Sequence, residues 1–521
     1  MSISSLTRKK VVIVGAGISG LTAGIYCLDN GFDVEIYEKH SIPGGECTGW
    51  TRRGQYIDGC AHWIVGTSKD SELYPLWEHI GAFDGNPVIH ETEYITKYEL
   101  SDGRTFTFYS DLDKLEREMI YFFPEDKRGI HSFIRNVKAY HHITVPSKKP
   151  LDFMNFIEFT LFGIKMLPAA LPFLHFKHVS VEEYCQTFHN PELGEVIYRF
   201  MEPIYNIHSF FYICSSVSKK DAGMFEGGSL QLVKRIADKF KRMGGKLFLN
   251  SPVKEIIVNK DNADGIILEN DKKIYADYVI ASCDAYHTLK KLLKGQYKDK
   301  IFDEQFADKE ANPINTSVMV AFKTNHPMSR YHKMMDYKVN EFNMFGRKMN
   351  HFGVRNYAFD TTLPSINDET LLTVLLPADE NIYEYLKSLS KEEYLKEKNE
   401  FGKTILGLLK QKMGLESNEI ELIDVVTPLT YERYTNAYKG SYMSFITTKY
   451  TKGLMRPGII KGLHSFVIAG QWIMPPGGLP IALISGKHAC QRICKIDGRK
   501  FINKEGSKEF SLEIFKKKQV I

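Results

Sequence analysis

Hydrophobic residues run without interruption through the first strand that the sequence pattern predicts. Residues Val11 to Val14 are all apolar, which is typical of a parallel strand buried on both faces. A helix is predicted over 19–30, ended by Gly31, and a second strand over 33–37. This strand–helix–strand order predicts an α/β fold that opens with a parallel unit.

Three glycines follow the first strand in a G-x-G-x-x-G arrangement: Gly15, Gly17 and Gly20. The first allows a tight turn, the second lets a pyrophosphate approach the helix N-terminus, and the third lets helix and strand pack closely. Glu38 ends the second strand about 20 residues past the glycines, where an acid is expected to bind a ribose hydroxyl. The arrangement predicts a dinucleotide site. We expect this site to include the neighbouring residues Ile18, Ser19 and Lys39.

A strand-rich region with helices is predicted in the second half of the chain. Strands are expected over 316–322 and 370–376, and a charged helix over 391–413. Two earlier strands, over 94–100 and 105–109, are assigned to the same substrate-side part of the protein.

The segment 153–176 is the least typical of a globular chain. It is almost entirely apolar, but Glu158 and Lys165 interrupt it, and Pro168 and Pro172 are expected to break any single helix. Two structures fit this pattern. The first is one or two buried core helices, and the second is an apolar lid or membrane-dipping element that guards a lipid channel.

Composition narrows the class of protein. The chain has 521 residues, enough for two or three interleaved domains, and its net charge of +5 is too diffuse to indicate nucleic-acid binding. The eight cysteines form no C-x-x-C pair and no metal-ligand set, so they are expected to be reduced thiols of a cytoplasmic protein. The lysines at 516–518 fit either a solvated terminus or a peripheral contact with the inner membrane face.

Three separated segments resemble a known family. They are 11–66, with the doublet Gly44-Gly45 and D-G-C-A-H-W-I-V-G over 58–66, then 225–284, and finally 466–490 with A-G-Q-W and P-P-G-G-L-P-I-A. Together they resemble FAD-dependent phytoene desaturases, carotenoid isomerases and retinol saturases, within the flavin amine oxidase superfamily. The resemblance implies an FAD cofactor and a Rossmann-like FAD-binding domain of the GR2 type, interleaved with an α+β substrate domain and a helical lid.

The domain boundaries follow from this resemblance and from the predicted elements. The FAD-binding domain is expected to be discontinuous, over 1–68, 222–300 and 460–498. The substrate domain is expected over 69–150 and 301–459, the helical lid over 151–221, and a basic tail over 499–521.

The resemblance also implies further cofactor contacts. The backbone of Val253 is expected to meet the adenine, and the other contacts are Gly45, Glu46, Gly470, Gln471, Leu479 and Ile481. Two of these depart from the family pattern. Glu46 stands where an arginine is usual, so Arg52 or Arg53 is expected to supply positive charge to the pyrophosphate. Gln471 stands where an aspartate is usual, and its amide can still donate or accept a hydrogen bond.

The chemistry that the resemblance implies is hydride exchange between flavin N5 and a carbon of an apolar lipid: a carotenoid, a retinoid or another isoprenoid. His62 and, less strongly, Tyr438 are the candidates for the accompanying proton transfer. The tyrosines around 431–445 fit either a polyene-stacking wall or core packing. No second G-x-G-x-x-G occurs in the sequence, so an electron donor or acceptor of unknown identity must visit the flavin. Two alternatives stay open: a flavin amine oxidase, and a non-enzymatic prenyl-binding protein of the GDP dissociation inhibitor type.

Overall fold

A five-stranded parallel sheet gathers segments from distant parts of the chain. The structure is a computed structural model, and it describes residues 8–60, 63–365, 367–453 and 455–506. The strands run in the order β10 (Lys246–Phe248), β2 (Asp33–Tyr37), β1 (Lys10–Val14), β14 (Tyr278–Ala281) and β20 (Phe466–Ile468). In register, Val12 lies between Glu35 and Val279. All four side chains of Val11–Val14 are buried, as the continuous apolar run predicts.

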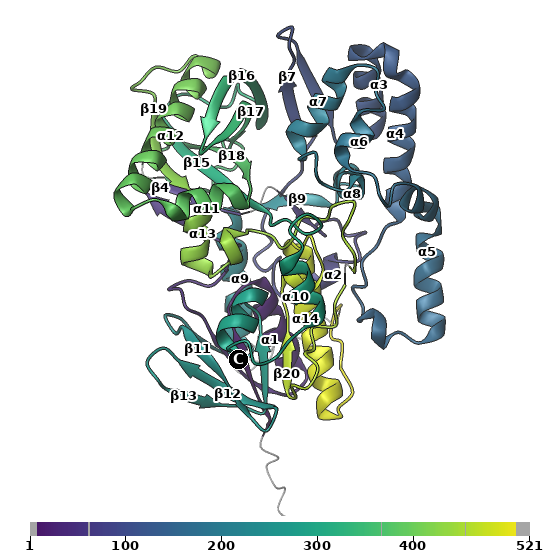
Figure 1. Cartoon of the computed structure of the whole chain (residues 1–521), viewed down its shortest axis with the longest axis vertical. Helices are drawn as coiled ribbons and strands as arrows, with labels where there is room; N and C mark the ends of the chain where they lie inside the picture. Colours follow the sequence, from purple (N-terminus) through teal and green to yellow (C-terminus); the bar gives the residue numbers. More distant parts are fainter. Residues whose placement is uncertain (1–7, 61–62, 366, 454, 507–521) are drawn as a thin grey trace, which may run out of the picture.

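Helices and a small sheet cover this parallel sheet on its two faces. One face packs against α1 (Ile18–Asp29), α9 (Gly228–Arg242) and α14 (Leu479–Asp497). The other face packs against an antiparallel sheet and against residues 285–293, which follow β14. That sheet comprises β11 (Val253–Asn259), β12 (Asn262–Leu268) and β13 (Lys273–Tyr275). These elements form the lower half of the molecule in Figure 1.

A seven-stranded sheet joins the two chain regions that were assigned to the substrate side. Its order is β19 (Ile420–Val426), β15 (Thr316–Thr324), β18 (Thr370–Ala378), β17 (Arg347–Asn356), β16 (Met334–Met344), β7 (Tyr94–Glu99) and β8 (Thr105–Tyr109). Only the β16–β7 pair is parallel. The predicted charged helix is α12 (Lys391–Met413), whose buried face packs on this sheet.

Helices α3 (Leu112–Phe122), α4 (Lys127–Ala139), α6 (Val181–Cys185), α7 (Pro191–Phe200) and α8 (Ile207–Ser218) form the upper right part of Figure 1. They surround an aromatic core in which the Phe133 and Phe210 rings lie 5.8 Å apart. The remaining named elements are short and connect these layers: β3 (Gly49–Arg52), β4 (Gln55–Asp58), β5 (Ile64–Val65), α2 (Tyr74–His79), β6 (Ile89–His90), β9 (Ala222–Phe225), α10 (Lys300–Ala307), α11 (Glu380–Ser388) and α13 (Pro428–Thr435).

The segment 153–176 contradicts two expectations. It forms one helix, α5 (Phe156–His175), with Pro168 and Pro172 inside it, so the prediction that the prolines break the helix is wrong. Each proline removes one backbone hydrogen bond, but the neighbouring turns of the helix keep their backbone hydrogen bonds. For example, the Phe176 N–H donates to the Pro172 carbonyl (3.0 Å). The buried-core expectation is wrong as well, because Ala169 is the only buried residue of this helix.

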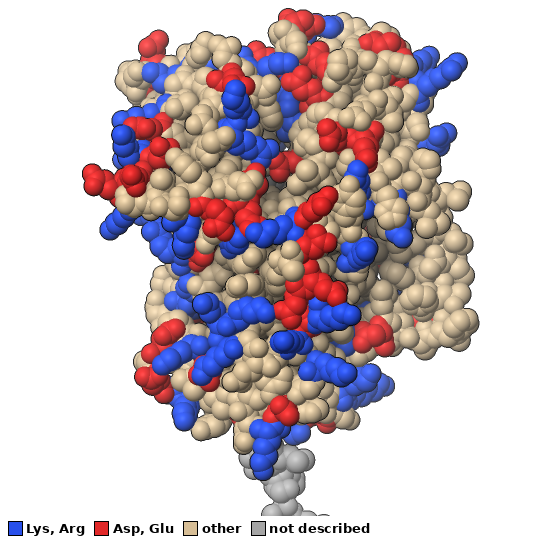
Figure 2. Space-filling view, viewed as in Figure 1, with Lys and Arg blue, Asp and Glu red and all other residues tan. Residues whose placement is uncertain are grey.

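Helix α5 instead lies at the margin of the molecule with its apolar side chains in solvent. Leu171 is 79% exposed and Leu167 is 62% exposed. Among the described residues, α5 is the one helix long and apolar enough to cross a membrane, by length and composition alone. Figure 1 shows it along the right edge, and Figure 2 shows few charged side chains over that edge.

We predict that Gly486→Ala destabilises the protein by at least about 2 kcal/mol, because α14 crosses α1 at this glycine. A Cβ there would lie 2.4 Å from the Ser19 carbonyl oxygen, which is backbone and cannot rotate away. The matched control is Gly407→Ala on α12, where a Cβ meets nothing within 4 Å. The free energy of unfolding of the control should rise by about 0.5–1 kcal/mol, because alanine has a higher helix propensity than glycine. Urea denaturation measures both variants, and equal effects would contradict the close approach of the two helices.

Candidate functional site

One large cavity of about 1890 Å³ extends from the N-terminus of α1 to the helices α7 and α8. A single small ligand usually occupies a pocket of roughly 300–1,000 Å³, so this cavity has room for more than one. Glycine loops line one end. Apolar and aromatic side chains line most of the other end, among them Trp63, Tyr98, Phe200, Met201, Tyr205, Tyr212, Ile213, Leu375 and Met443.

The glycine end is built by close approach of backbone to backbone. Gly15 turns the chain with φ of +99°, and a Cβ on Gly20 would lie 2.1 Å from the Gly15 carbonyl oxygen. Gly17 caps α1 without a side-chain hydrogen bond and pairs with Gly44 in a short parallel bridge. The first N–H groups of α1 therefore face the cavity without a capping side chain, which is the usual arrangement for binding a phosphate.

A second uncapped helix N-terminus faces the same cavity. Helix α14 begins after Gly477 and Gly478, which have φ of +90° and +86°. Gln471 holds this turn, because its Oε1 accepts from Gly478 N (3.2 Å) and its Nε2 donates to the Tyr442 carbonyl (3.4 Å). Gly470, Gln471, Leu479 and Ile481 all line the cavity.

Glu38 and Lys39 lie beside the glycine loops. Glu38 accepts hydrogen bonds from Ala16 N (2.8 Å) and His40 N (2.9 Å), so its carboxylate braces the turn after β1. Lys39 donates to Asn436 Oδ1 (2.7 Å) and the Arg433 carbonyl (3.0 Å), and burial lowers its pKa. Lys39 thus ties the end of β2 to the segment after α13.

Glu46 is the most unusual polar residue of the cavity. Its side chain is partly buried in the cavity wall, and burial raises its pKa to about 7 despite a hydrogen bond with Thr435, with a further contribution from the negative charge of Asp284. Its Oε1 has no hydrogen-bond partner among the residues that the structure describes. Asp284 is also buried, which raises its pKa to about 6 despite hydrogen bonds from His287 N (2.8 Å) and Tyr438 N (2.9 Å). Near neutral pH, Glu46 can therefore carry a proton and donate to an anionic ligand instead of repelling it.

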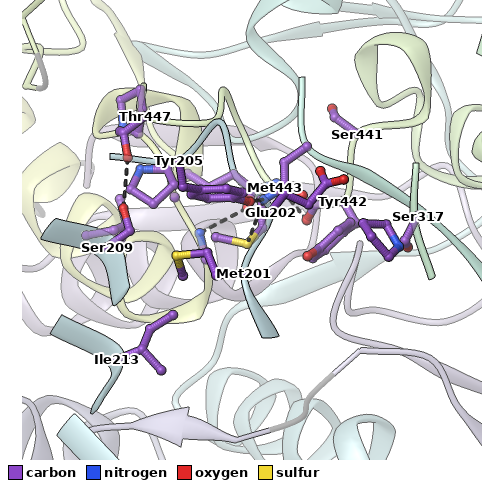
Figure 3. Close-up of a pocket in the computed structure, with 18 of the residues that line it drawn as sticks. Met201, Glu202, Tyr205, Ser209, Ile213, Ser317, Ser441, Tyr442, Met443 and Thr447 are labelled. Carbon is purple, nitrogen blue, oxygen red and sulfur yellow. Dashed lines mark hydrogen bonds between the residues drawn. The ribbon is translucent and has the colours of Figure 1, made fainter. Parts of the chain in front are cut away.

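The opposite end of the cavity contains paired polar groups between the apolar side chains. Arg199 Nε donates to Asp336 Oδ1 (2.6 Å), and Arg347 forms an ion pair with Glu202. In Figure 3, Met201, Tyr205, Met443 and Tyr442 lie together, and the hydrogen-bonded pair Ser209–Thr447 (3.0 Å) lies to one side. Tyr205 Oη accepts from Asn315 Nδ2 (2.5 Å). The charges at this end are therefore paired with one another, whereas Tyr98 Oη, His208 Nε2 and Ser441 Oγ have no hydrogen-bond partner among the described residues.

The uncapped N–H groups at the starts of α1 and α14, together with the glycine turns before these helices (the glycine cradle), fit a flavin dinucleotide. A comparison with family models matches residues 18–494 to the flavin-containing amine oxidoreductases. The chain belongs to this family. The predicted family, the Rossmann-like fold class and the FAD cofactor are thereby confirmed.

Two relatives of this family member are distant in sequence but match it over nearly the whole chain. A 4,4'-diapophytoene desaturase from Methylomonas sp. is 23% identical over 513 residues, covering 93% of this chain and 95% of that protein. A chloroplastic prolycopene isomerase from an Oncidium hybrid cultivar is 22% identical, covering 92% and 83%. The solved structure of a putrescine oxidase variant superposes with a TM-score of 0.61 at 16% identity, covering 94% of this chain and 99% of that one, which shows a shared fold.

The cavity wall contains only some of the residues predicted for the flavin site. Gly17, Ile18, Ser19, Gly45, Glu46 and the four residues near α14 line the cavity, whereas Gly15 and Gly20 form the turn beneath it. Val253 begins β11 next to the loop in which Ser251 N donates to the Glu38 carbonyl (2.8 Å), outside the cavity wall. His62 lies outside the described residues. The roles of these residues in cofactor binding and catalysis stay predictions.

Three residues predicted to supply charge or transfer a proton lie outside the cavity wall. Arg52 and Arg53 point to the seven-stranded sheet, where they pair with Asp424 and Glu421 and are mostly exposed, so neither lies in the cavity. The Tyr438 ring packs on Tyr286, with centroids 4.3 Å apart, and does not line the cavity. Its position gives no support to a catalytic role. The polyene-stacking wall is not formed either, because Tyr442 is the one member of that cluster in the cavity wall, among the residues that the structure describes.

The paired polar residues of the far end, such as Arg199 and Asp336, were missed by the sequence analysis. They come from α7 and β16, which are far apart in the chain, and no motif links them. Asp284 carried the one useful signal, since it follows β14 at the carboxyl edge of the parallel sheet.

We predict that Glu46→Gln changes how stability depends on pH. The pKa of the carboxyl is about 7 when folded and near 4.5 when unfolded, so ionisation destabilises the fold as pH rises from about 4.5 to 7. Above that range, ionisation of Glu46 lowers the free energy of unfolding of the wild type by about 3 kcal/mol. Between about pH 5 and pH 8, the free energy of unfolding of the flavin-free variant should therefore rise relative to that of the wild type by up to this amount.

Urea denaturation of the flavin-free proteins at several pH values measures this difference. The control is Glu304→Gln on α10, whose side chain is 65% exposed and which should show no such trend. A stability difference for Glu46→Gln that does not vary with pH would contradict the raised pKa.

Proposed function

We propose that the protein is an FAD-dependent oxidoreductase that saturates, desaturates or isomerises carbon–carbon double bonds of an apolar lipid of the carotenoid, retinoid or isoprenoid type. One observation carries this proposal. A single cavity joins a dinucleotide cradle to a long, mostly apolar chamber in which the charged side chains of Arg199 and Arg347 are paired with Asp336 and Glu202. Such a chamber favours a substrate that offers apolar surface and few polar atoms.

The names of the relatives support the same substrate class. A desaturase that forms 4,4'-diapolycopene and an isomerase of prolycopene both act on apolar carotenoids. The identities of 23% and 22% leave the individual substrate of this chain open to experiment.

The residues of this chain have three tasks in the reaction. We propose that Gly17, Ile18, Ser19, Gly45, Gly470, Gln471, Leu479 and Ile481 hold the cofactor, and that Glu38 and Val253 bind its adenosine part. A bound flavin supplies hydride exchange at N5. Glu46 is the group in the described part of the cavity whose pKa of about 7 suits it to hold and release a proton near neutral pH. The apolar walls exclude water from the reacting carbons.

The first test is an anaerobic absorbance spectrum of the purified protein. We expect flavin bands near about 370 and 450 nm. Bleaching by NAD(P)H that reverses when a polyene is added would indicate a saturase, and bleaching by the polyene alone would indicate a desaturase. Polyene isomerisation without net bleaching would indicate an isomerase. Bleaching by an amine with release of hydrogen peroxide would replace the proposal with an amine oxidase. A protein that cannot bind FAD would leave only a lipid carrier.

We also propose that α5 rests on a membrane from which the substrate enters. The C-terminal part of α5 reaches the cavity, since Phe173 lines it together with Lys177 just beyond the helix. The rest of the helix exposes leucine, isoleucine and phenylalanine side chains that no other part of the described chain covers. Exposed apolar surface of this length beside a lipid chamber fits a helix lying at a bilayer interface.

We predict that replacing Leu167 and Leu171 by glutamine weakens binding to phospholipid vesicles at least about tenfold, because each leucine contributes roughly 1.5 kcal/mol or more when buried. The control variant replaces Leu395 and Ile502, which are 52% and 53% exposed on other surfaces. Vesicle co-sedimentation gives the binding, and the urea midpoint should stay unchanged in both variants. Equal vesicle binding by the two variants would count against a membrane role for α5.

A further inference from the structure

Two cysteines lie opposite each other across the hairpin of β3 and β4. The hairpin register pairs Arg52 with Gln55 and continues outward to Gly49 and Asp58. It extends one step beyond the strands, because Gly59 N donates to the Thr48 carbonyl (3.0 Å). The next facing pair in this register is Cys47 and Cys60.

The position of this pair in the ladder suits a disulfide. Because a backbone hydrogen bond joins residues 48 and 59, continuing the register by one residue makes Cys47 and Cys60 a non-hydrogen-bonded pair. Residues facing each other in such a pair generally have Cα atoms about 4.5 Å apart, within the range of about 4.4–6.8 Å that a disulfide spans. The Cys47 thiol, together with burial, raises the pKa of Cys60 well above its usual value, and Cys47 Sγ also donates to the Ser229 carbonyl (3.8 Å).

Both thiols belong to the wall of the cofactor cavity. Cys47 and Cys60 line it next to Glu46, and Cys60 also borders a small side chamber with Tyr431 and Tyr442. The other described cysteines lack this combination. Cys490 Sγ lies 4.0 Å from Cys494 Sγ, but both are buried in α14 away from the cavity. Cys283 lines the cavity, but its Sγ contacts Thr288 Oγ1 (3.2 Å).

We propose that Cys47 and Cys60 form a redox-active dithiol–disulfide pair that exchanges two electrons with the flavin of the same cavity. When the disulfide forms, two S–H bonds break and one S–S bond forms, and the two thiols lose two electrons and two protons. A flavin bound in this cavity in its oxidised form would accept the same two electrons and two protons, so the exchange balances. The reverse reaction returns the pair to the dithiol that the structure contains. This proposal rests on the flavin cofactor but not on the identity of the lipid.

The surroundings of the pair keep the Cys60 thiol protonated at neutral pH. The Cys47 thiol, burial and the nearby carboxyls of Asp58 and Glu46 all raise the pKa of Cys60. The reduced form that enters the exchange is therefore a neutral thiol at Cys60, and its proton leaves when the disulfide forms.

The first test needs no variant. The native holoprotein is equilibrated with graded ratios of reduced to oxidised dithiothreitol, its free thiols are alkylated, and it is digested with trypsin. Trypsin cuts after Lys39, Arg52, Arg53 and Lys69, so the two cysteines fall on separate peptides, 40–52 and 54–69. We expect a disulfide-linked pair of these two peptides that disappears over a narrow range of ratios. Absence of this linked pair at every ratio would overturn the proposal, whatever the substrate of the enzyme.

The second test counts electrons. Anaerobic titration of the oxidised holoprotein with dithionite, followed at the flavin absorbance, should consume about four electrons per flavin, two for the flavin and two for the disulfide. Cys60→Ala should consume about two. Cys185→Ala, which removes a buried thiol of α6 outside the cavity, should behave as the wild type. Uptake of about two electrons by the wild type would overturn electron exchange, even if linked peptides form. If the protein binds no flavin, the proposed function is contradicted. The peptide test would then still decide whether Cys47 and Cys60 form a disulfide.

Discussion

The close approach of backbone segments around the N-terminus of α1 is the contact on which the rest of the structure depends. At Gly20 the helix nearly touches the Gly15 carbonyl, and at Gly486 the last helix nearly touches the Ser19 carbonyl. Side chains would hold these segments apart and fill the space in which a dinucleotide can lie. The contact also unites parts of the chain that are far apart in sequence, since α14, near the C-terminal end of the chain, packs against α1, near the N-terminal end. The large cavity opens directly from this junction.

Charge in the cofactor end is arranged in an unusual way. Glu46 and Asp284 lie near the glycine cradle, both have raised pKa values, and no arginine among the described residues contributes to either shift. A buried ionised carboxylate without a partner is strongly destabilising, and keeping a proton on such a group relieves this cost. The same proton turns a group that would repel a phosphate into one that can donate to it. In the function proposed above, stability, cofactor binding and proton transfer are coupled through the Glu46 side chain.

The two ends of the cavity place different demands on the fold. The flavin end requires fixed backbone geometry, which the parallel sheet and two helix N-termini provide. The lipid end requires apolar walls and a path for a water-insoluble substrate, and α5 supplies an apolar surface next to that path. Cys47 and Cys60 lie in the cavity wall, two residues beyond the paired strands β3 and β4 of the hairpin that leaves the glycine cradle.

The sequence by itself determined the elements whose signals are local. The apolar run of β1, the glycine spacing and the charged helix α12 each depend on residues close together in the chain, so the dinucleotide fold and the flavin were predictable. The position of the segment 153–176 in the fold was not predictable. An apolar helix suits a core, a membrane surface or a lid equally well, and its neighbours in the fold decide between them. Tertiary structure alone decided that Arg52 and Arg53 turn to Asp424 and Glu421, that Tyr438 packs on Tyr286, and that Cys47 faces Cys60. These outcomes depend on which side chains meet across long separations in sequence, and that follows from strand register and packing rather than from local spacing.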